Sequence, residues 1–234
     1  VALGFEIVAG YRRFEACRSL RWRHIQSKIR ELSDKQTYEI QLTENIQRKS
    51  LNALEEAEAF KKYVDDGYKI IAPVPSCVLM FKQELPLLFP DNMDIKNISM
   101  ALHDPFEYLL KLHDQGNLKT DFTKEIGSIF YQVACHQRVQ NIGQVTKKIL
   151  ELVPNTDVEA LERCSGHDGT YGVKKETHEI AIKIAAPIVR QYEKNKAPQF
   201  TSDCTLAAHH IVNAMGNKVM PTHPISLIKQ AYGI

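Results

Sequence analysis

The sequence predicts an α/β protein: a mainly parallel sheet flanked by helices in the C-terminal part, preceded by a small, partial α+β piece. Three observations lead to this expectation. After Gly67, short apolar runs alternate with longer amphipathic segments, as in β/α units. Before Gly67 the segments are more charged, and an apolar run opens abruptly at Tyr68. Hydrophobic residues make up 44% and charged residues 25% of the chain, which is ordinary for a globular protein.

The composition of the chain limits which classes of function it can have. The chain has 234 residues and a formal net charge of +2, so no global positive field favours nucleic acid as a partner. No apolar run approaches the roughly 20 residues that a membrane span needs, and no secretory signal is visible. Five widely spaced cysteines do not suggest a disulfide framework. We therefore expect a cytoplasmic protein whose cysteines are free thiols or ligands of a metal or cluster.

The first part of the chain combines short apolar runs with charged helical segments. Ser33 and Asp34 are good N-cap residues for one helix, and Asn52 is a good N-cap for the last one. The expected elements are a strand at 5–9, a helix at 11–20, a second strand from Trp22 to Arg30, a helix from Lys35 to about Asn45, and a helix that ends near Gly67.

The second part alternates strands and helices. Apolar runs rich in Ile, Val and Phe predict the strands, and apolar residues at spacings of three and four predict the helices. The strands are expected at 69–74, 126–135, 156–164 and 200–204, and the helices at 76–89, 94–116 (one or two), 141–152, 173–194, 206–216 and 223–233.

A phosphate-site pattern lies near the start of the chain. The segment IVAGYRRFEA, residues 7–16, places Gly10, Arg12 and Arg13 between a strand and a helix. The N-terminus of a helix attracts anions, and arginines donate two parallel hydrogen bonds to phosphate. The simpler alternative is a solvated basic face of the helix.

Together with ENIQRKSLNALEEAEAF at residues 44–60, the segment AGYRRFEA resembles the N-terminal domain of ParB-type chromosome-partition proteins. The resemblance covers about residues 4–67 and defines residues 1–67 as the first predicted domain. It implies a site for CTP and Mg²⁺, with DNA as a partner only under this alternative. The residues implied are Gly10, Arg12, Arg13, Glu44, Asn45 and Arg48.

Three cysteines of the second part each follow a predicted strand. Cys135, Cys164 and Cys204 stand in ACHQRVQNIG, ERCSGHDGTYG and SDCTLAAHH, each next to or near a histidine or glycine. Thiolates are soft ligands suited to iron–sulfur clusters or zinc. For any one of them alone, a small buried hydrophobic residue is the favoured interpretation. The recurrence in three strand-end loops favours one shared site.

With VPSCVLMFKQELP, the segment ERCSGHDGTYG makes residues 68–234 resemble the cysteine-rich iron–sulfur subunits of heterodisulfide reductase and of anaerobic glycerol-3-phosphate dehydrogenase, where it is the C subunit. Such proteins have two cysteine-rich modules. The resemblance implies that the second module is complete, with the three cysteines as ligands, while Cys77 alone is left of the first. Ser165 stands where many relatives have a second cysteine. The implied cofactor is an iron–sulfur cluster, with zinc as the alternative.

The histidines beside these cysteines are further candidates. His136 and His167 are predicted to complete a Cys₃His site or to carry protons, the alternative being capping or surface residues. Of the neighbouring pair His209 and His210, one is expected to point inward. No catalytic residue is assigned.

Three functional hypotheses follow. The first is an electron-transfer subunit of an oxidoreductase, whose partners are other redox subunits, a flavoprotein or a membrane anchor that brings it to the membrane. The second is a ParB-like CTP-binding partition protein. The third is a composite chain, natural or artefactual, in which neither site functions.

Overall fold

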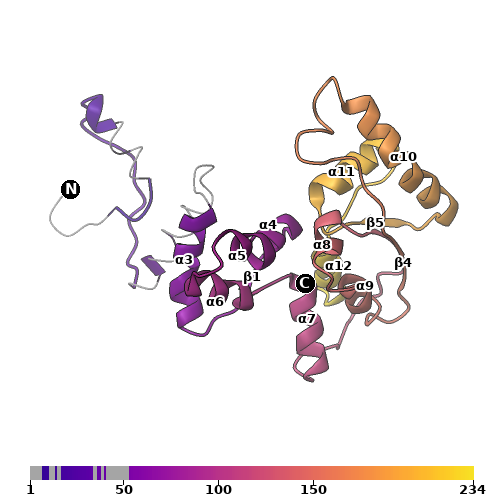
Figure 1. Ribbon diagram of the computed structural model, residues 1–234, viewed down its shortest axis with the longest axis horizontal. Coiled ribbons are helices and arrows are strands. Elements are labelled where there is room, and N and C mark those ends of the chain that lie inside the picture. The colour runs from indigo at the N-terminus through magenta and orange to yellow at the C-terminus, as the bar shows by residue number, and fades with distance from the viewer. Residues whose placement is uncertain (1–6, 11–13, 15–16, 34–35, 38–39, 41–52) are drawn as a thin grey trace. The chain divides into compact units, whose positions relative to one another are not determined.

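The computed structural model describes residues 7–10, 14, 17–33, 36–37, 40 and 53–234 (Figure 1). The chain divides into two compact units, Val1–Lys62 and Tyr63–Ile234. The domain assignment made from the sequence, 1–67 and 68–234, stays a prediction. The α/β class with parallel sheets flanked by helices is confirmed.

In the first unit, the predicted strand from Trp22 to Arg30 is wrong. Residues 22–33 contain neither helix nor strand. Ile29 is 70% exposed and Trp22 62%, so these apolar side chains have no surface to pack on, and a strand without a partner is not stable in water. Residues 7–10 are also not a strand, whereas Phe14, 17–19, 36–37 and 40 are helical, as predicted.

Helix α3, Ala53–Asp65, runs from the first unit into the second. Asn52, its predicted N-cap, lies outside the described residues. The second unit then contains the following elements: β1 Ile70–Ile71, α4 Pro75–Leu79, the π-helical turn η1 Met80–Glu84, α5 Leu85–Leu88, α6 Met93–Ala101, β2 Leu102–His103, α7 Pro105–Asp114, β3 Ser128–Gln132, α8 Cys135–Val139, α9 Val145–Leu150, β4 Asp157–Leu161, α10 His178–Asn195, β5 Gln199–Thr201, α11 Thr205–Ala214 and α12 Pro224–Ala231.

The π-helical turn has an identifiable cause. Pro86 has no amide hydrogen, so the carbonyl of Lys82 four residues earlier lacks its normal helical partner. The hydroxyl of Ser99 in α6 donates to that carbonyl at 2.8 Å. At the same place the amide of Leu85 bonds to the carbonyl of Met80, five residues back. Ser99 therefore satisfies a carbonyl that the helix leaves free.

Five strands in the described part form two parallel sheets. β1 pairs with β2, and the larger sheet has the order β4-β3-β5. β3 is the central strand of the larger sheet; Gln132 pairs with Leu161 on β4, and Tyr131 pairs with Thr201 on β5. Parallel strands need crossover connections, and here helices supply them.

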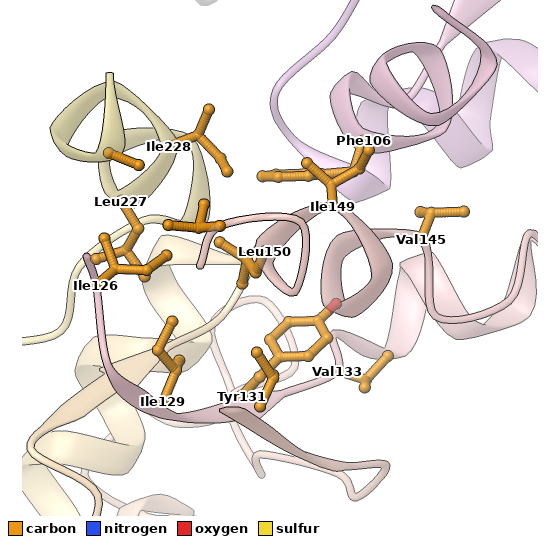
Figure 2. Close-up of a cluster of buried hydrophobic side chains, with 13 residues drawn as sticks. Phe106, Ile126, Ile129, Tyr131, Val133, Val145, Ile149, Leu150, Leu227 and Ile228 are labelled. Atoms are coloured by element: carbon orange, nitrogen blue, oxygen red, sulfur yellow. The ribbon is translucent and has the colours of Figure 1, made fainter. Parts of the chain in front are cut away.

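Two hydrophobic cores cover the two faces of the larger sheet. On one face, Ile129 and Tyr131 of β3 pack with Ile149 and Leu150 of α9 and Leu227 of α12, as Figure 2 shows. On the other face, neighbouring side chains of β3 and β5 pack against α10 and α11. The buried members of this second core are Phe130, Ala185, Ile188, Ala197, Phe200, Ala208, Ile211, Val212 and Met215. Successive side chains of a strand point to opposite faces, which explains the division.

Helix α7 has a complete capping box. The Asp104 side chain accepts from the amides of Phe106 and Glu107, and Glu107 in return accepts from the amide of Asp104.

No helix in the described part of the chain has the length and hydrophobicity to cross a lipid bilayer.

Candidate metal centre

The three cysteines predicted as ligands follow three adjacent parallel strands at equal distance. β3 ends at Gln132, β4 at Leu161 and β5 at Thr201, and the third residue after each is Cys135, Cys164 or Cys204. Adjacent parallel strands end at the same edge of a sheet. The fold therefore brings all three cysteines to one edge.

Two of the three thiols lie close enough to affect each other. Cys135 is at the start of α8, and Cys164 is in the loop after β4. Burial raises the pKa of the Cys135 thiol, and the neighbouring Cys164 raises it further. Arg138 and the backbone at Ser165 act in the opposite direction. Cys164 is exposed, so the pair is open to solvent on one side.

Cys204 is the N-cap of α11. Its sulfur accepts from the amide of Ala207 at 3.5 Å, and its own amide donates to the Ser202 hydroxyl at 3.3 Å. Among the residues that the structure describes, no three His, Cys, Asp or Glu side chains are arranged to hold a metal ion. The structure thus places Cys135 near Cys164 and Cys204 at the same sheet edge, without a finished three-ligand arrangement in the described part of the chain.

The loop after Cys164 turns tightly around its sulfur. The amide of Gly166 donates to the Cys164 sulfur at 3.4 Å, and the amide of His167 donates to the Ser165 hydroxyl at 3.3 Å. Gly166 has φ +77°, and a Cβ there would lie 2.4 Å from the carbonyl oxygen of Ala181 in α10. Only glycine allows this backbone to approach the helix so closely.

The candidate histidines have different surroundings. His136 is exposed on α8. The ring of His167 faces that of His210 in α11, with the centroids 6.1 Å apart. Of the pair predicted to include one inward residue, His210 is buried and His209 is exposed, which confirms that prediction. Burial lowers the pKa of His210, and His167 and His178 lower it further.

A buried polar network lies directly behind the cysteine loops. Tyr131 contacts the side chains of Gln137 and Asp203, each at 2.5 Å. The Thr146 hydroxyl donates to the Asp203 carboxyl group at 3.0 Å, and the side-chain amide of Gln137 donates to the Thr146 hydroxyl at 3.1 Å. The side-chain amide of Gln137 also donates to the Asp104 carboxyl group at 3.5 Å.

The two carboxyl groups of this network have altered acidities. Burial raises the pKa of Asp203 to about 7, and the nearby Asp104 acts in the same direction. Burial likewise raises the pKa of Asp104, against hydrogen bonds from backbone amides of α7 that lower it. Sequence patterns do not predict this network. In the sequence, this network is indicated only by two polar residues: Asp203, one place before Cys204, and Gln137, two places after Cys135.

Of the predicted nucleotide site, the structure describes Gly10 alone. Its φ is +84°, and its carbonyl accepts from the amide of Phe14 at 3.0 Å, as at the first turn of a helix. The other predicted residues, Arg12, Arg13, Glu44, Asn45 and Arg48, lie outside the described residues.

Comparison with known proteins confirms both sequence resemblances. Residues 2–46 match the family model of the ParB N-terminal domain, and residues 129–209 match the family model of the cysteine-rich domain. The second match contains all three predicted cysteine ligands.

Relatives are found for each part. The chain is 29% identical over 167 residues to the C subunit of anaerobic glycerol-3-phosphate dehydrogenase of Escherichia coli (strain K12), which is 70% of this chain and 41% of that protein. Over 61 residues, 26% of this chain, it is 44% identical to "Nucleoid occlusion protein" of Lysinibacillus sphaericus (strain C3-41) and 46% to that of Shouchella clausii (strain KSM-K16). These matches cover 20% and 22% of the nucleoid occlusion proteins. The chain thus spans less than half the length of the relatives it matches.

Proposed function

We propose that residues 68–234 form an iron–sulfur electron-transfer subunit of an oxidoreductase and that Cys135, Cys164 and Cys204 hold its cluster. The observation that carries the proposal is the equal placement of these cysteines after three adjacent parallel strands. The electrostatic interaction of the Cys135 thiol with the Cys164 thiol supports it.

The side chains at this edge fit such a group chemically. Cysteine thiolates are the usual ligands of iron–sulfur clusters. Backbone amides already donate to two of the sulfurs, from Gly166 to Cys164 and from Ala207 to Cys204. Such donors stabilise thiolate charge and raise the reduction potential of a bound cluster. The fourth position would be filled by another ligand, for which His136 and His167 are the sequence candidates.

When bound, the cluster would supply one-electron chemistry. The chain itself would fix the ligand loops through strand pairing and through the buried network of Tyr131, Gln137 and Asp203 below them. This network and the apolar cores exclude water from the inner side of the site. Exposed Cys164 leaves the outer side accessible to an electron-exchange partner.

Partners and location follow from the relative in Escherichia coli. Because that protein is by its name one subunit of a dehydrogenase, we propose that this chain works with other redox subunits, a flavoprotein or a membrane anchor. It would then reside in the cytoplasm and reach the membrane through them. Zinc at the same cysteines is the alternative cofactor.

The test is iron and sulfide analysis with EPR spectroscopy on anaerobically purified protein. We expect bound iron, reduced at least several-fold by Cys135→Ser, Cys164→Ser or Cys204→Ser. Cys17→Ser, in the other unit, is the matched control and should leave the iron content unchanged. Iron-free protein with bound zinc would favour the zinc alternative, and protein free of both metals with five titratable thiols would refute the proposal.

A second function is favoured by the family match at residues 2–46. We propose that residues 1–67 form a ParB-like piece that binds CTP with Mg²⁺ through Gly10, Arg12, Arg13, Glu44, Asn45 and Arg48. Calorimetric titration with CTP and Mg²⁺ should show binding that Arg13→Ala abolishes. No heat at millimolar nucleotide would remove this proposal, and failure of both tests would leave a composite chain in which neither site functions.

A further inference from the structure

Gln132, the last residue of the central strand β3, is a polar side chain that is completely buried. It lies on the same face of the sheet as Phe130, two residues earlier, whose ring belongs to the core formed with α10 and α11. A buried amide is costly unless its polar atoms have partners. The partners of Gln132 therefore indicate what this side chain does at the end of the strand.

Both ends of the Gln132 side-chain amide are hydrogen-bonded. Its Nε2 donates to the backbone carbonyl of Arg163 at 2.8 Å and to that of Val133 at 2.7 Å. Its Oε1 accepts from the hydroxyl of Ser202 at 2.8 Å. Because the two carbonyls can only accept, the nitrogen of the amide must face them and the oxygen must face Ser202. The chemistry of the partners thus fixes the orientation of the amide.

Two of these partners stand immediately before a cysteine or close to one. Arg163 directly precedes Cys164, and Ser202 precedes Cys204 by two residues. The Ser202 hydroxyl also accepts from the backbone amide of Cys204 at 3.3 Å. A single side chain at the end of β3 is therefore bonded to the loop after β4 and to the segment after β5.

The network around Tyr131 makes a different connection. Tyr131 and Gln132 are neighbours in β3, so their side chains lie on opposite faces of the sheet. The hydroxyl of Tyr131 contacts Gln137 in α8 and Asp203 in the segment after β5. Gln132 adds the loop after β4, so the two residues together join all three cysteine-bearing segments to the end of the central strand.

We propose that Gln132 is a positioning residue of the cysteine site, which holds the loops of Cys164 and Cys204 at a fixed place relative to β3 and thereby to Cys135. This role rests on the proposed function, although the hydrogen bonds are present without a metal. They fix the backbone beside the cysteines, while the direction of each sulfur atom depends on its own side-chain torsion. Outer partners that hold ligand-bearing segments in place strengthen metal binding, because less order has to be created when the metal enters.

Thiol cross-linking in metal-free protein tests this role. Dibromobimane joins two thiols that lie close together, and the thiols of Cys135 and Cys164 are near enough to affect each other. In the reduced, chelator-treated full chain, peptide mapping should find the cross-link between these two residues. Gln132→Met keeps the length of the side chain but removes its hydrogen bonds, so the yield of this cross-link should fall several-fold.

Two further variants separate positioning from a general loss of stability. Ser99→Ala is the matched control, because it also deprives a backbone carbonyl, that of Lys82, of its donor, but outside the cysteine loops. It should leave the cross-link yield unchanged. Gln132→Glu provides a rescue, because a protonated carboxyl group can donate to the Arg163 carbonyl whereas an ionised one cannot. The yield of this variant relative to the parent chain at the same pH should therefore fall as the pH rises.

Three outcomes would overturn the inference: no cross-link between Cys135 and Cys164 in the parent chain, an equal yield in Gln132→Met, or an equal loss in Ser99→Ala. If Gln132→Met does not fold, as judged by circular dichroism, the pH dependence of Gln132→Glu decides instead. The iron analysis of the parent chain judges the proposed function separately. A chain without iron that shows the Gln132-dependent cross-link would keep this inference and lose that function, and bound iron with a Gln132-independent cross-link would do the reverse.

Discussion

The hydroxyl of Tyr131 in the central strand lies 2.5 Å from Oδ2 of Asp203, the residue that precedes Cys204. The same hydroxyl is 2.5 Å from Oε1 of Gln137. One hydroxyl has a single proton, so a second proton is needed to satisfy both contacts. A protonated Asp203 supplies it, in agreement with the pKa of that carboxyl group being raised by burial to about 7. The ring position of Tyr131 in the core is seen in Figure 2.

Tyr131→Phe keeps the ring and removes this hydroxyl. The Gln137 carbonyl oxygen and the Asp203 carboxyl group then stay buried without this partner, so the free energy of unfolding should fall by about 1–3 kcal/mol. Urea unfolding followed by circular dichroism measures the change. Tyr192→Phe is the control, because its ring packs on Phe130 and Phe200 while no hydrogen bond of its hydroxyl is found in the described residues. Equal effects of the two substitutions would contradict the prediction.

Gly166→Ala should be more harmful than Gly143→Ala. Both glycines have positive φ, +77° and +73°, so each alanine carries a similar backbone cost of about 1 kcal/mol. At position 166 the new Cβ also meets the carbonyl of Ala181, at 2.4 Å, whereas Gly143 faces open space. The extra cost should be about 1–3 kcal/mol in urea unfolding. Equal costs would show that the loop after Cys164 can move away from α10.

Ser99→Ala should destabilise the chain through the π-helical turn. It leaves the Lys82 carbonyl, which Pro86 cannot satisfy, without a donor, and we expect a loss of about 1–2 kcal/mol. Thermal unfolding is a sufficient readout. Ser76→Ala, at an exposed position in the adjoining helix α4, is the control and should be neutral or slightly stabilising.

His103 should make the protein less stable in mild acid. Burial lowers its pKa, while Glu107 raises it and Lys82 and Lys111 lower it. Between this lowered value and the ordinary value near 6.5, the unfolded chain binds more protons than the folded chain. Stability is therefore full above about pH 6.5 and falls as the pH drops below it.

His103→Gln removes the loss of stability that protonation of His103 causes at low pH. The stability difference between about pH 7 and about pH 5 should be smaller in this variant than in the parent chain, as measured by urea unfolding at both values. His209→Gln, at an exposed histidine, is the control. Parallel pH profiles of His103→Gln and the parent chain would refute the assignment.

Sequence patterns predict the second unit well because its strands and helices are strongly apolar on their buried faces. β3, β4 and β5 lie within or next to the predicted runs, and α10, α11 and α12 lie close to the predicted helices. The predicted helix at 94–116 is interrupted by β2, a two-residue strand too short to leave a periodic pattern. Helix α8 escapes prediction because CHQRV has little apolar periodicity.

The error in the first unit has a different origin. Ile25 and Ile29 form a pattern that predicts a strand, yet both are exposed. Burial depends on a partner surface, which a local pattern does not encode.

The placement of the three cysteines at one edge of the sheet can be predicted because parallel strands bring their ends to one edge whatever the details of packing. The hydrogen bonds of Gln132 cannot, because their partners Arg163 and Ser202 are distant in the sequence and come near it only in the fold. The same holds for the link between Gln137 and Asp203, which lie far apart in the sequence and meet through Tyr131.

Each cysteine lies three residues after the end of its strand, so the pairing of the strands determines where the three sulfur atoms lie. Sliding β4 by one residue along β3 would carry Cys164 about 3.3 Å along the sheet and turn every side chain of β4 to the opposite face. A single inserted residue between Leu161 and Cys164 would displace the sulfur without changing any proposed ligand. The spacing from strand to thiol is thus as much a part of the proposed site as the thiol itself.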